Sequence, residues 1–288
     1  MSRELASRRF SALGSTCELL ALGVGQAALE RCEERVREEE ARFTRFVKDS
    51  ELARLNAGDG RYVPVTPEMF AMLEAALWAF QESGGLVNAA ILPALTAAGY
   101  DRPFRQGLTH PGSSEPMYVP GLPEVLILDG TTRSIALAPG AALDLGGIAK
   151  GALADILIDE LGDDAVCNLG GDVRVRGNGP DGDGWHIGLC DHSAVAVRDG
   201  AVCTSGTTRR RWGQSMHHLI DPNTGMPVKT DLAEVSVITD FALRGEVYAK
   251  CAMLLGASAG LAFLDSRGVR YAVVPVAGNG DGLIPAAA

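Results

Sequence analysis

The sequence predicts an α+β fold in which mixed or antiparallel sheets and helices form separate blocks. Three observations lead to this prediction. Short apolar runs end in glycine turns, Asp129-Gly130 separates two such runs as in a β-hairpin, and the helical patterns do not alternate regularly with the strands. We expect a single domain over residues 1–288, with its core at about 8–276 and tails at 1–8 and after 277.

The helices are predicted from caps and from apolar spacing. Segment 26–43 is charged and carries Glu33/Arg37 at an i,i+4 spacing, which is typical of a solvated helix. Thr66 is an N-cap residue followed by Pro67, and apolar residues then repeat at helical spacing until Ser83. Further helices are expected over 148–161, 241–255 and 257–265.

The strands are predicted from short apolar runs that end in turn residues. Segment 99–123 is rich in Pro, Gly, Ser and His without a period, and it is expected to be a long surface loop. The expected strands are 16–23, 125–128, 134–137, 166–169, 173–176, 185–190, 194–197, 201–204, 234–239 and 269–276.

Charge and cysteine usage narrow the function classes. A formal charge of −10 argues against nucleic acid as a partner, because nucleic-acid binders collect Lys and Arg on one face. Six cysteines without CxxC spacing indicate free thiols in a reducing compartment. Neither a signal-peptide core nor an uninterrupted apolar stretch of about 20 residues is present, so we expect a cytoplasmic protein without a membrane span.

A glycine pair marks a candidate phosphate site. Gly146-Gly147 precedes the predicted 148–161 helix, and Lys150 lies in its first turn. Backbone N–H groups at a helix N-terminus attract anions, so a pyrophosphate would suit this position. The alternative is a packing turn, since the chain has neither GxGxxG nor GxxxxGK[ST].

Four long motifs occur along the chain: Asp144-Leu-Gly-Gly-Ile-Ala-Lys-Gly151, Asn168-Leu-Gly-Gly-Asp172, Thr204-Ser-Gly206 and His218-Leu-Ile-Asp-Pro-Asn-Thr-Gly225. In kind and in order they resemble the motifs of the FAD:protein FMN transferases, the ApbE family, and the resemblance extends across residues 8 to 276. Thr44-Arg45-Phe46 and the segment from Ser50 to Asn56 also match that family. The resemblance implies a T-fold-type α+β protein with FAD in a central cleft, which transfers FMN to a Thr or Ser of another protein, usually with Mg²⁺.

The resemblance also assigns roles to residues of this chain. Lys150 is implied to contact FAD, and His218 and Asp221 to lie beside the reacting phosphate. For His218 the alternative is a backbone cap, and for Asp221 it is an ordinary turn before proline. The implied cofactor-binding set is Asn56, Asp144, Gly146, Gly147, Lys150, Asn168, Gly170, Asp172, Thr204, Ser205 and Gly206.

The implied metal site departs from the family pattern. Where the family has Ala-Asp-x-x-x-Thr, this chain has Gly245-Glu246-Val-Tyr-Ala-Lys250. Glu246 and the carbonyl of Gly147 would ligate a metal, but an ammonium has no lone pair to offer. Our hypothesis is that Lys250 stands where the dication would; the alternative is an exposed helix pair.

Two other departures remove carboxylates from the implied ligand region. Val87-Asn88-Ala89-Ala90 replaces the family's Phe-Asp-Pro-Thr, and Thr207-Thr208 replaces an Asp-Tyr. Arg209–Arg211 follow directly and would add positive charge near phosphate. The resemblance makes FMN transfer the main predicted function, and the catalytic candidates are His218, Asp221, Glu246 and Lys250. The alternatives are FAD hydrolysis to FMN and AMP, or FAD binding without turnover as a carrier or sensor.

Overall fold

The computed structural model describes residues 4–108, 110, 112–113, 115–213 and 216–276. The chain divides into two compact units. Unit 1 comprises Met1–Glu38, Lys150–Thr208 and Lys229–Ala288, and unit 2 comprises Glu39–Ala149 and Arg209–Val228. The single domain expected over residues 1–288 stays a prediction.

Unit 1 is built on a seven-stranded sheet in which every pair of neighbouring strands is antiparallel. The strand order is β1-β2-β6-β7-β10-β15-β16, and a separate hairpin is formed by β8 and β9. The elements are β1 (Leu5–Ala12), β2 (Ser15–Leu22), α1 (Gln26–Phe43), α6 (Ala149–Leu161), β6 (Ala165–Leu169), β7 (Asp172–Arg176), β8 (Trp185–Gly188), β9 (Ala194–Val197), β10 (Asp199–Gly206), β15 (Leu232–Thr239), α7 (Ala242–Ser266) and β16 (Arg270–Pro275).

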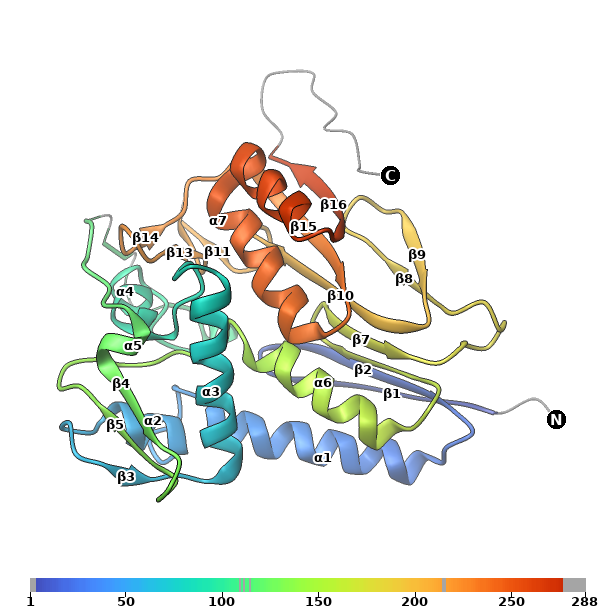
Figure 1. The fold of residues 1–288 in the computed structure, drawn as a ribbon, viewed down its shortest axis with the longest axis horizontal. Helices are drawn as coiled ribbons and strands as arrows, with labels where there is room; N and C mark the ends of the chain where they lie inside the picture. Colours follow the sequence, from blue (N-terminus) through green and yellow to red (C-terminus); the bar gives the residue numbers. More distant parts are fainter. Residues whose placement is uncertain (1–3, 109, 111, 114, 214–215, 277–288) are drawn as a thin grey trace. The chain divides into compact units, whose positions relative to one another are not determined.

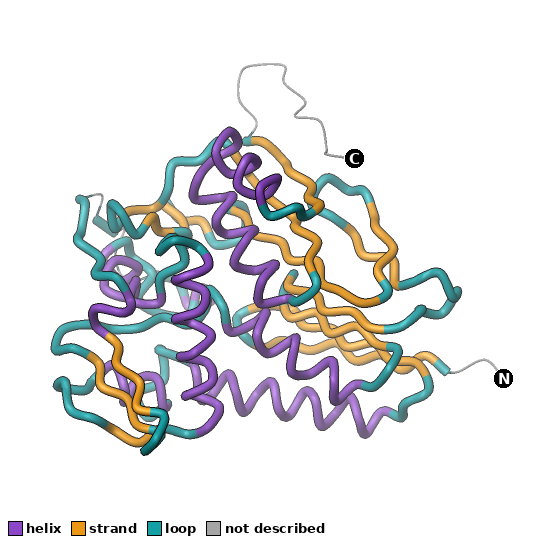
Figure 2. Tube along the Cα trace, in the orientation of Figure 1, coloured by secondary structure: helices purple, strands orange, loops and turns teal. Residues whose placement is uncertain are grey.

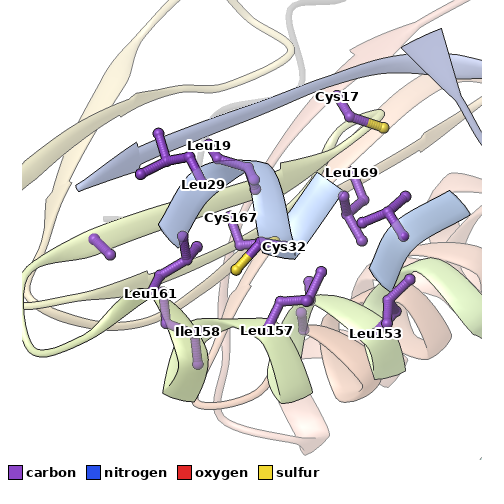
Figure 3. Close-up of a cluster of buried hydrophobic side chains, with 14 of the residues drawn as sticks. Cys17, Leu19, Leu29, Cys32, Leu153, Leu157, Ile158, Leu161, Cys167 and Leu169 are labelled. Atoms are coloured by element: carbon purple, nitrogen blue, oxygen red, sulfur yellow. The ribbon is translucent and has the colours of Figure 1, made fainter. Parts of the chain in front are cut away.

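The main core of unit 1 lies between this sheet and helices α1 and α6 (Figures 1 and 3). Alternate residues of β2 and β6 point to it, namely Cys17 and Leu19, and Cys167 and Leu169. This period of two is what a strand with one face toward helices requires. The helices contribute Leu29, Cys32, Leu153, Leu157, Ile158 and Leu161.

A second core in unit 1 uses the remaining strand positions. Val166, which alternates with the β6 residues of the main core, and its cross-strand partner Val175 cluster with Trp185 and Val197 of the β8–β9 hairpin. The sheet therefore has apolar residues on both faces, helices covering one and a hairpin the other. This arrangement explains why its central strands read as nearly continuous apolar runs.

Helix α7 packs against β10 and β15 and covers the late strands of the sheet (Figures 1 and 2). It is interrupted at Gly256, where φ is 76° and ψ is 176°, between the two helices that the sequence predicts. Among the described residues, α7 alone is long and apolar enough to cross a membrane, by length and composition only. Its burial against the sheet is typical of the core helix of a globular protein.

Unit 2 contains a three-stranded antiparallel sheet and several short helices. The predicted hairpin around Asp129-Gly130 is confirmed, because Leu126–Asp129 pairs with Ser134–Leu137. The elements are α2 (Glu51–Asn56), β3 (Val63–Pro64), α3 (Pro67–Glu82), the 3₁₀ turn η1 (Ala89–Ile91), α4 (Leu92–Ala97), the 3₁₀ turn η2 (Phe104–Gln106), α5 (Leu122–Val125), β4 (Leu126–Asp129), β5 (Ser134–Leu137), β11 (Arg211–Trp212), β12 (Met216–His217), β13 (Ile220–Asp221) and β14 (Met226–Pro227).

The predicted start of helix α3 and the predicted loop at 99–123, both in unit 2, are confirmed. Thr66 caps α3 by accepting a hydrogen bond from the Met69 amide, and Pro67 occupies the first helical turn. The 99–123 segment holds only η2 and the start of α5 among its described residues, which agrees with a long loop.

The expected N-terminal tail at residues 1–8 is wrong in its second half. Leu5–Ala12 is an edge strand, β1, that pairs with Ser15–Leu22. Arg8 on this strand forms ion pairs with Glu30 and Glu33 of α1. These pairs connect the strand to the helix that packs against the sheet. The expected tail after residue 277 lies outside the described residues.

Candidate functional site

Lys150 lies at the centre of a buried ion cluster in unit 1. Its Nζ donates to Asp172 Oδ2 and, at 3.0 Å, to Glu246 Oε1. The three residues come from α6, β7 and α7, and the Asp172 and Glu246 side chains are 3% and 4% exposed. Buried carboxylates are costly unless they are paired and hydrogen-bonded, so Lys150 stabilises both.

Both carboxylate oxygens of Glu246 accept hydrogen bonds. Oε2 accepts from the Gly151 amide at 2.9 Å, and Oε1 accepts from Lys150. Lys250, one helical turn on, places its Nζ 3.7 Å from Oε1. The alternative of an ordinary exposed Glu246–Lys250 pair is wrong, because the Lys250 side chain is only 16% exposed and Glu246 is buried.

A glycine allows the close approach that forms this cluster. A Cβ at Gly151 would lie 2.7 Å from the carbonyl oxygen of Ala242 and 2.8 Å from Leu243 Cα. The start of α7 therefore crosses α6 at backbone contact distance, where the Gly151 amide reaches Glu246. Asp155, one turn further along α6, accepts from the Ala242 and Leu243 amides at 2.8 and 2.9 Å and fixes the N-terminus of α7.

The two buried carboxyl groups respond to this environment differently. Burial, reinforced by the charge of Glu246, raises the pKa of Asp172 to about 6 despite the attraction of Lys150. Burial also opposes ionisation of Glu246, but Lys150, Lys250 and the Gly151 amide together hold its pKa below the ordinary value. Glu246 therefore stays ionised to a lower pH than Asp172 does.

The predicted glycine turn Asn168–Asp172 lies beside the cluster, whereas Thr204–Gly206, also predicted as a turn, is the end of strand β10 because it pairs with β15. Asn168 Oδ1 accepts from the Gly171 amide at 2.9 Å, which shapes the turn between β6 and β7. Gly170 adopts φ of 76° in this turn, and a Cβ there would lie 2.5 Å from that of Ser15. The Thr204 amide donates to the Gly171 carbonyl at 3.0 Å, so the end of β10 and the Asn168 turn share one end of the sheet.

The Thr204–Gly206 segment is held by contacts to β15. Thr204 Oγ1 lies 2.7 Å from Ser236 Oγ on β15. Ser205 and Gly206 end β10, and they pair with Val235 and Glu234. Within unit 1 the structure therefore brings together Lys150, Asn168, Gly170, Asp172, Thr204 and Glu246, all of which were predicted site residues.

In unit 2, Asn56 and Asp144 organise the segment before α6. The Asn56 side chain donates to the Leu143 carbonyl at 2.9 Å and accepts from the Leu143 amide at 2.7 Å. Asp144 Oδ1 accepts from the Gly146 amide at 2.9 Å. The Gly146 N–H therefore donates to a carboxylate of its own loop, and the prediction that this amide is unpaired and open to an anion is wrong. Gly147, the next residue, stays a predicted site residue.

A basic and aromatic cluster in unit 2 adds residues to which the sequence reasoning gave no role. Arg45 Nε donates to Asp144 Oδ2 at 2.6 Å, and its guanidinium stacks over Phe46 and Tyr100. Trp212 continues this cluster, with its ring 5.9 Å from that of Tyr100. The Thr44-Arg45-Phe46 motif was the only signal for it, since Tyr100 and Trp212 lie in segments without a period.

His218 and Asp221 lie at a tight hairpin in unit 2. The His218 amide donates to the Arg210 carbonyl at 3.3 Å. Asp221 Oδ1 accepts from the Asn223 amide and side chain at 2.9 and 3.0 Å, so Asp221 does serve the turn that was the alternative reading. Their catalytic roles stay predictions, as does a phosphate role for Arg209–Arg211.

The residues present do not fit Mg²⁺. This ion requires near-octahedral oxygen ligands at about 2.0–2.1 Å. Both oxygens of Glu246 already accept N–H donors, and Lys250 places an ammonium beside one of them. Across the described part of the chain, no group of three or more His, Cys, Asp or Glu side chains is placed to hold a metal.

The structure thus defines an α+β protein in which the motif residues of unit 1 gather around a buried lysine–carboxylate cluster. The model of the ApbE family matches residues 13–274, and the chain belongs to that family. The α+β fold class and the family resemblance inferred from the sequence are therefore confirmed.

Individual relatives agree with this assignment. The FAD:protein FMN transferase of Klebsiella pneumoniae (strain 342) is 32% identical over 76% of this chain and 72% of its own length. That of Treponema pallidum (strain Nichols) is 32% identical over 80% and 72%. The crystal structure of the apo form of Pseudomonas stutzeri flavinyl transferase ApbE has a TM-score of 0.82 at 24% identity, covering 97% and 93% of the two chains.

Proposed function

We propose that this chain is an FAD:protein FMN transferase, which cleaves FAD and transfers FMN to a Thr or Ser of an acceptor protein. Membership of the ApbE family and the names of its curated relatives support this function. The observation in the structure that carries it is the buried Lys150 cluster, beside which the Asn168 turn and the end of β10 in unit 1 meet.

The reaction is a phosphoryl transfer. The acceptor hydroxyl oxygen bonds to the phosphorus of the FMN half as the bridging P–O bond breaks. AMP leaves with the bridging oxygen, and the hydroxyl proton is released to water. Such reactions depend on positioning and on neutralising phosphate charge, so a fixed cation near the diphosphate is the main requirement.

Lys150 meets this requirement in the proposed site. Asp172 and Glu246 hold its ammonium from two sides, so little conformational freedom is lost when an anion binds. The turn at Gly170-Gly171 brings backbone close to Lys150, since a Cβ at Gly170 would lie 4.0 Å from Lys150 Cδ. Asn56, Thr204, Ser205, His218 and Asp221 remain proposed contacts to FAD or to the acceptor.

A direct test is to incubate the purified protein with FAD, with and without a flavin-accepting protein. We expect a covalently yellow acceptor and one AMP released for each FMN transferred. The Lys150→Met variant, with its fold checked by circular dichroism, should transfer about 10- to 100-fold more slowly, the worth of one charged hydrogen bond. Unmodified acceptor with AMP release would instead indicate FAD hydrolysis, and unchanged bound FAD would indicate a carrier or sensor.

The remaining partner and location proposals follow from charge and cysteine state. All six cysteines are free thiols, and five of them are buried. This supports a cytoplasmic location, because reducing compartments keep thiols unpaired. The net charge of −10 supports the proposal that nucleic acid is not a partner. Cell fractionation with an antibody to the protein tests the location.

A further inference from the structure

Two lysines flank a single buried carboxylate in unit 1. Lys150 Nζ lies 3.0 Å and Lys250 Nζ 3.7 Å from the same oxygen of Glu246. With Asp172, the cluster therefore contains two ammonium groups and two carboxyl groups, and all four side chains are less than one-fifth exposed. The cluster balances its charges with the protein's own cations.

A divalent cation would have to displace one of these ammonium groups. Glu246 Oε2 is engaged by the Gly151 amide, whose position is fixed by the crossing of α6 and α7. Oε1 is shared between the two lysines. A metal bound to Oε1 would lie against an ammonium of like charge, and Lys250 would offer it no lone pair.

We propose that Lys250 takes the place of a metal ion in this protein, so that Lys150 and Lys250 together supply the positive charge that meets the diphosphate of FAD. The inference rests on the transferase function proposed above. Lys250 lies on α7, and Asp155 fixes the N-terminus of this helix. The Lys250 ammonium forms an ion pair with Glu246, which lies one helical turn before it. FAD binding and FMN transfer then proceed without Mg²⁺.

The test compares FAD affinity in buffer containing a chelator and in buffer containing Mg²⁺, followed by flavin fluorescence. Wild-type protein should bind FAD equally, within about twofold, in both buffers. Calorimetric titration of Mg²⁺ into the apoprotein and into the FAD complex should show no binding. Lys250→Gln should weaken FAD binding about tenfold, which corresponds to one charged contact, whereas Arg31→Gln, which removes an exposed charge from α1, should leave it unchanged.

A gain-of-metal variant makes the test reciprocal. The double variant Glu246→Asp, Lys250→Thr removes the ammonium and presents two oxygen ligands of the kind that Mg²⁺ prefers. Its FAD binding should be at least about tenfold weaker in chelator than in Mg²⁺, and thermal unfolding in both buffers checks that it is folded. A double variant that is indifferent to Mg²⁺ would count against the assignment of this position.

Two outcomes separate the inference from the function on which it rests. FAD uptake by the wild-type protein that requires Mg²⁺, or stoichiometric Mg²⁺ binding that Glu246→Gln abolishes, would overturn this inference and leave the transferase proposal standing. A wild-type protein that takes up no FAD in either buffer would overturn the proposed function, and this inference with it.

Discussion

Replacing Glu246 with Gln is the sharpest test of the buried ion cluster. The change keeps the shape of the side chain and removes the charge that faces both Lys150 and Lys250. Removing one partner of a buried ion pair typically costs about 3–5 kcal/mol. The amide oxygen of Gln still accepts one hydrogen bond, from Gly151 or Lys150, which recovers about 1 kcal/mol.

The expected loss of unfolding free energy is therefore about 3 kcal/mol. For a chain of this size, about 2 °C of melting temperature is lost for each kcal/mol, so Glu246→Gln should melt about 6 °C lower. Urea unfolding followed by far-UV circular dichroism measures the free energy directly. Glu34→Gln, an exposed position on α1, is the matched control and should change it by less than about 0.5 kcal/mol.

Equal urea midpoints for Glu246→Gln and the Glu34→Gln control would refute the reasoning. That result would mean that the Glu246 carboxylate is solvated and does not balance the two lysines. A lower slope of free energy against urea, without a shift in midpoint, would contradict it as well, since the cluster is expected to act on the folded state.

Two further predictions concern stability. Gly151→Ala should lower the free energy of unfolding by about 1–3 kcal/mol, because the new Cβ would meet Ala242 O at 2.7 Å; Gly188→Ala, with nothing within 4 Å, is the control, and equal urea midpoints would contradict the close helix crossing. Burial lowers the pKa of His217 below 6.5, so the unfolded chain takes up a proton first as pH falls. The contribution of His217 to stability should therefore be full above pH 6.5 and decline below it, by at most about 1.4 kcal/mol per pH unit. His217→Asn should remove this contribution from the urea-midpoint profile; an unchanged profile would exclude His217 as the cause.

Some predictions from sequence held because their signals are local. Thr66 accepts from an amide three residues ahead, and the Asp129 turn joins two adjacent strands. The i,i+4 spacing of Glu246 and Lys250 places both side chains on one face of a helix wherever that helix packs. Such features depend only on residues that are close along the chain.

Other predictions failed because neighbours in space decide them. Residues 1–8 were predicted to be a tail, yet Leu5–Ala12 is an edge strand because it pairs with β2 and its Arg8 forms an ion pair with Glu33 of α1. In that case the partner is a strand and a helix whose positions the sequence pattern does not specify. Gly146 is a different case: it precedes a helix and was interpreted as an anion donor, but Asp144, only two residues before it, accepts its amide, a local contact that the prediction did not weigh.

The sequence alone determined the family, the α+β class and the residue types available to the site, because these are carried by motifs and by periodicity. The tertiary structure alone decided the state of charge and burial of those residues. Lys150 on α6 contacts Asp172 on β7, 22 residues away in the sequence, and Glu246 on α7, 96 residues away. Such contacts depend on how the helices pack on the sheet, and packing is set by the whole core.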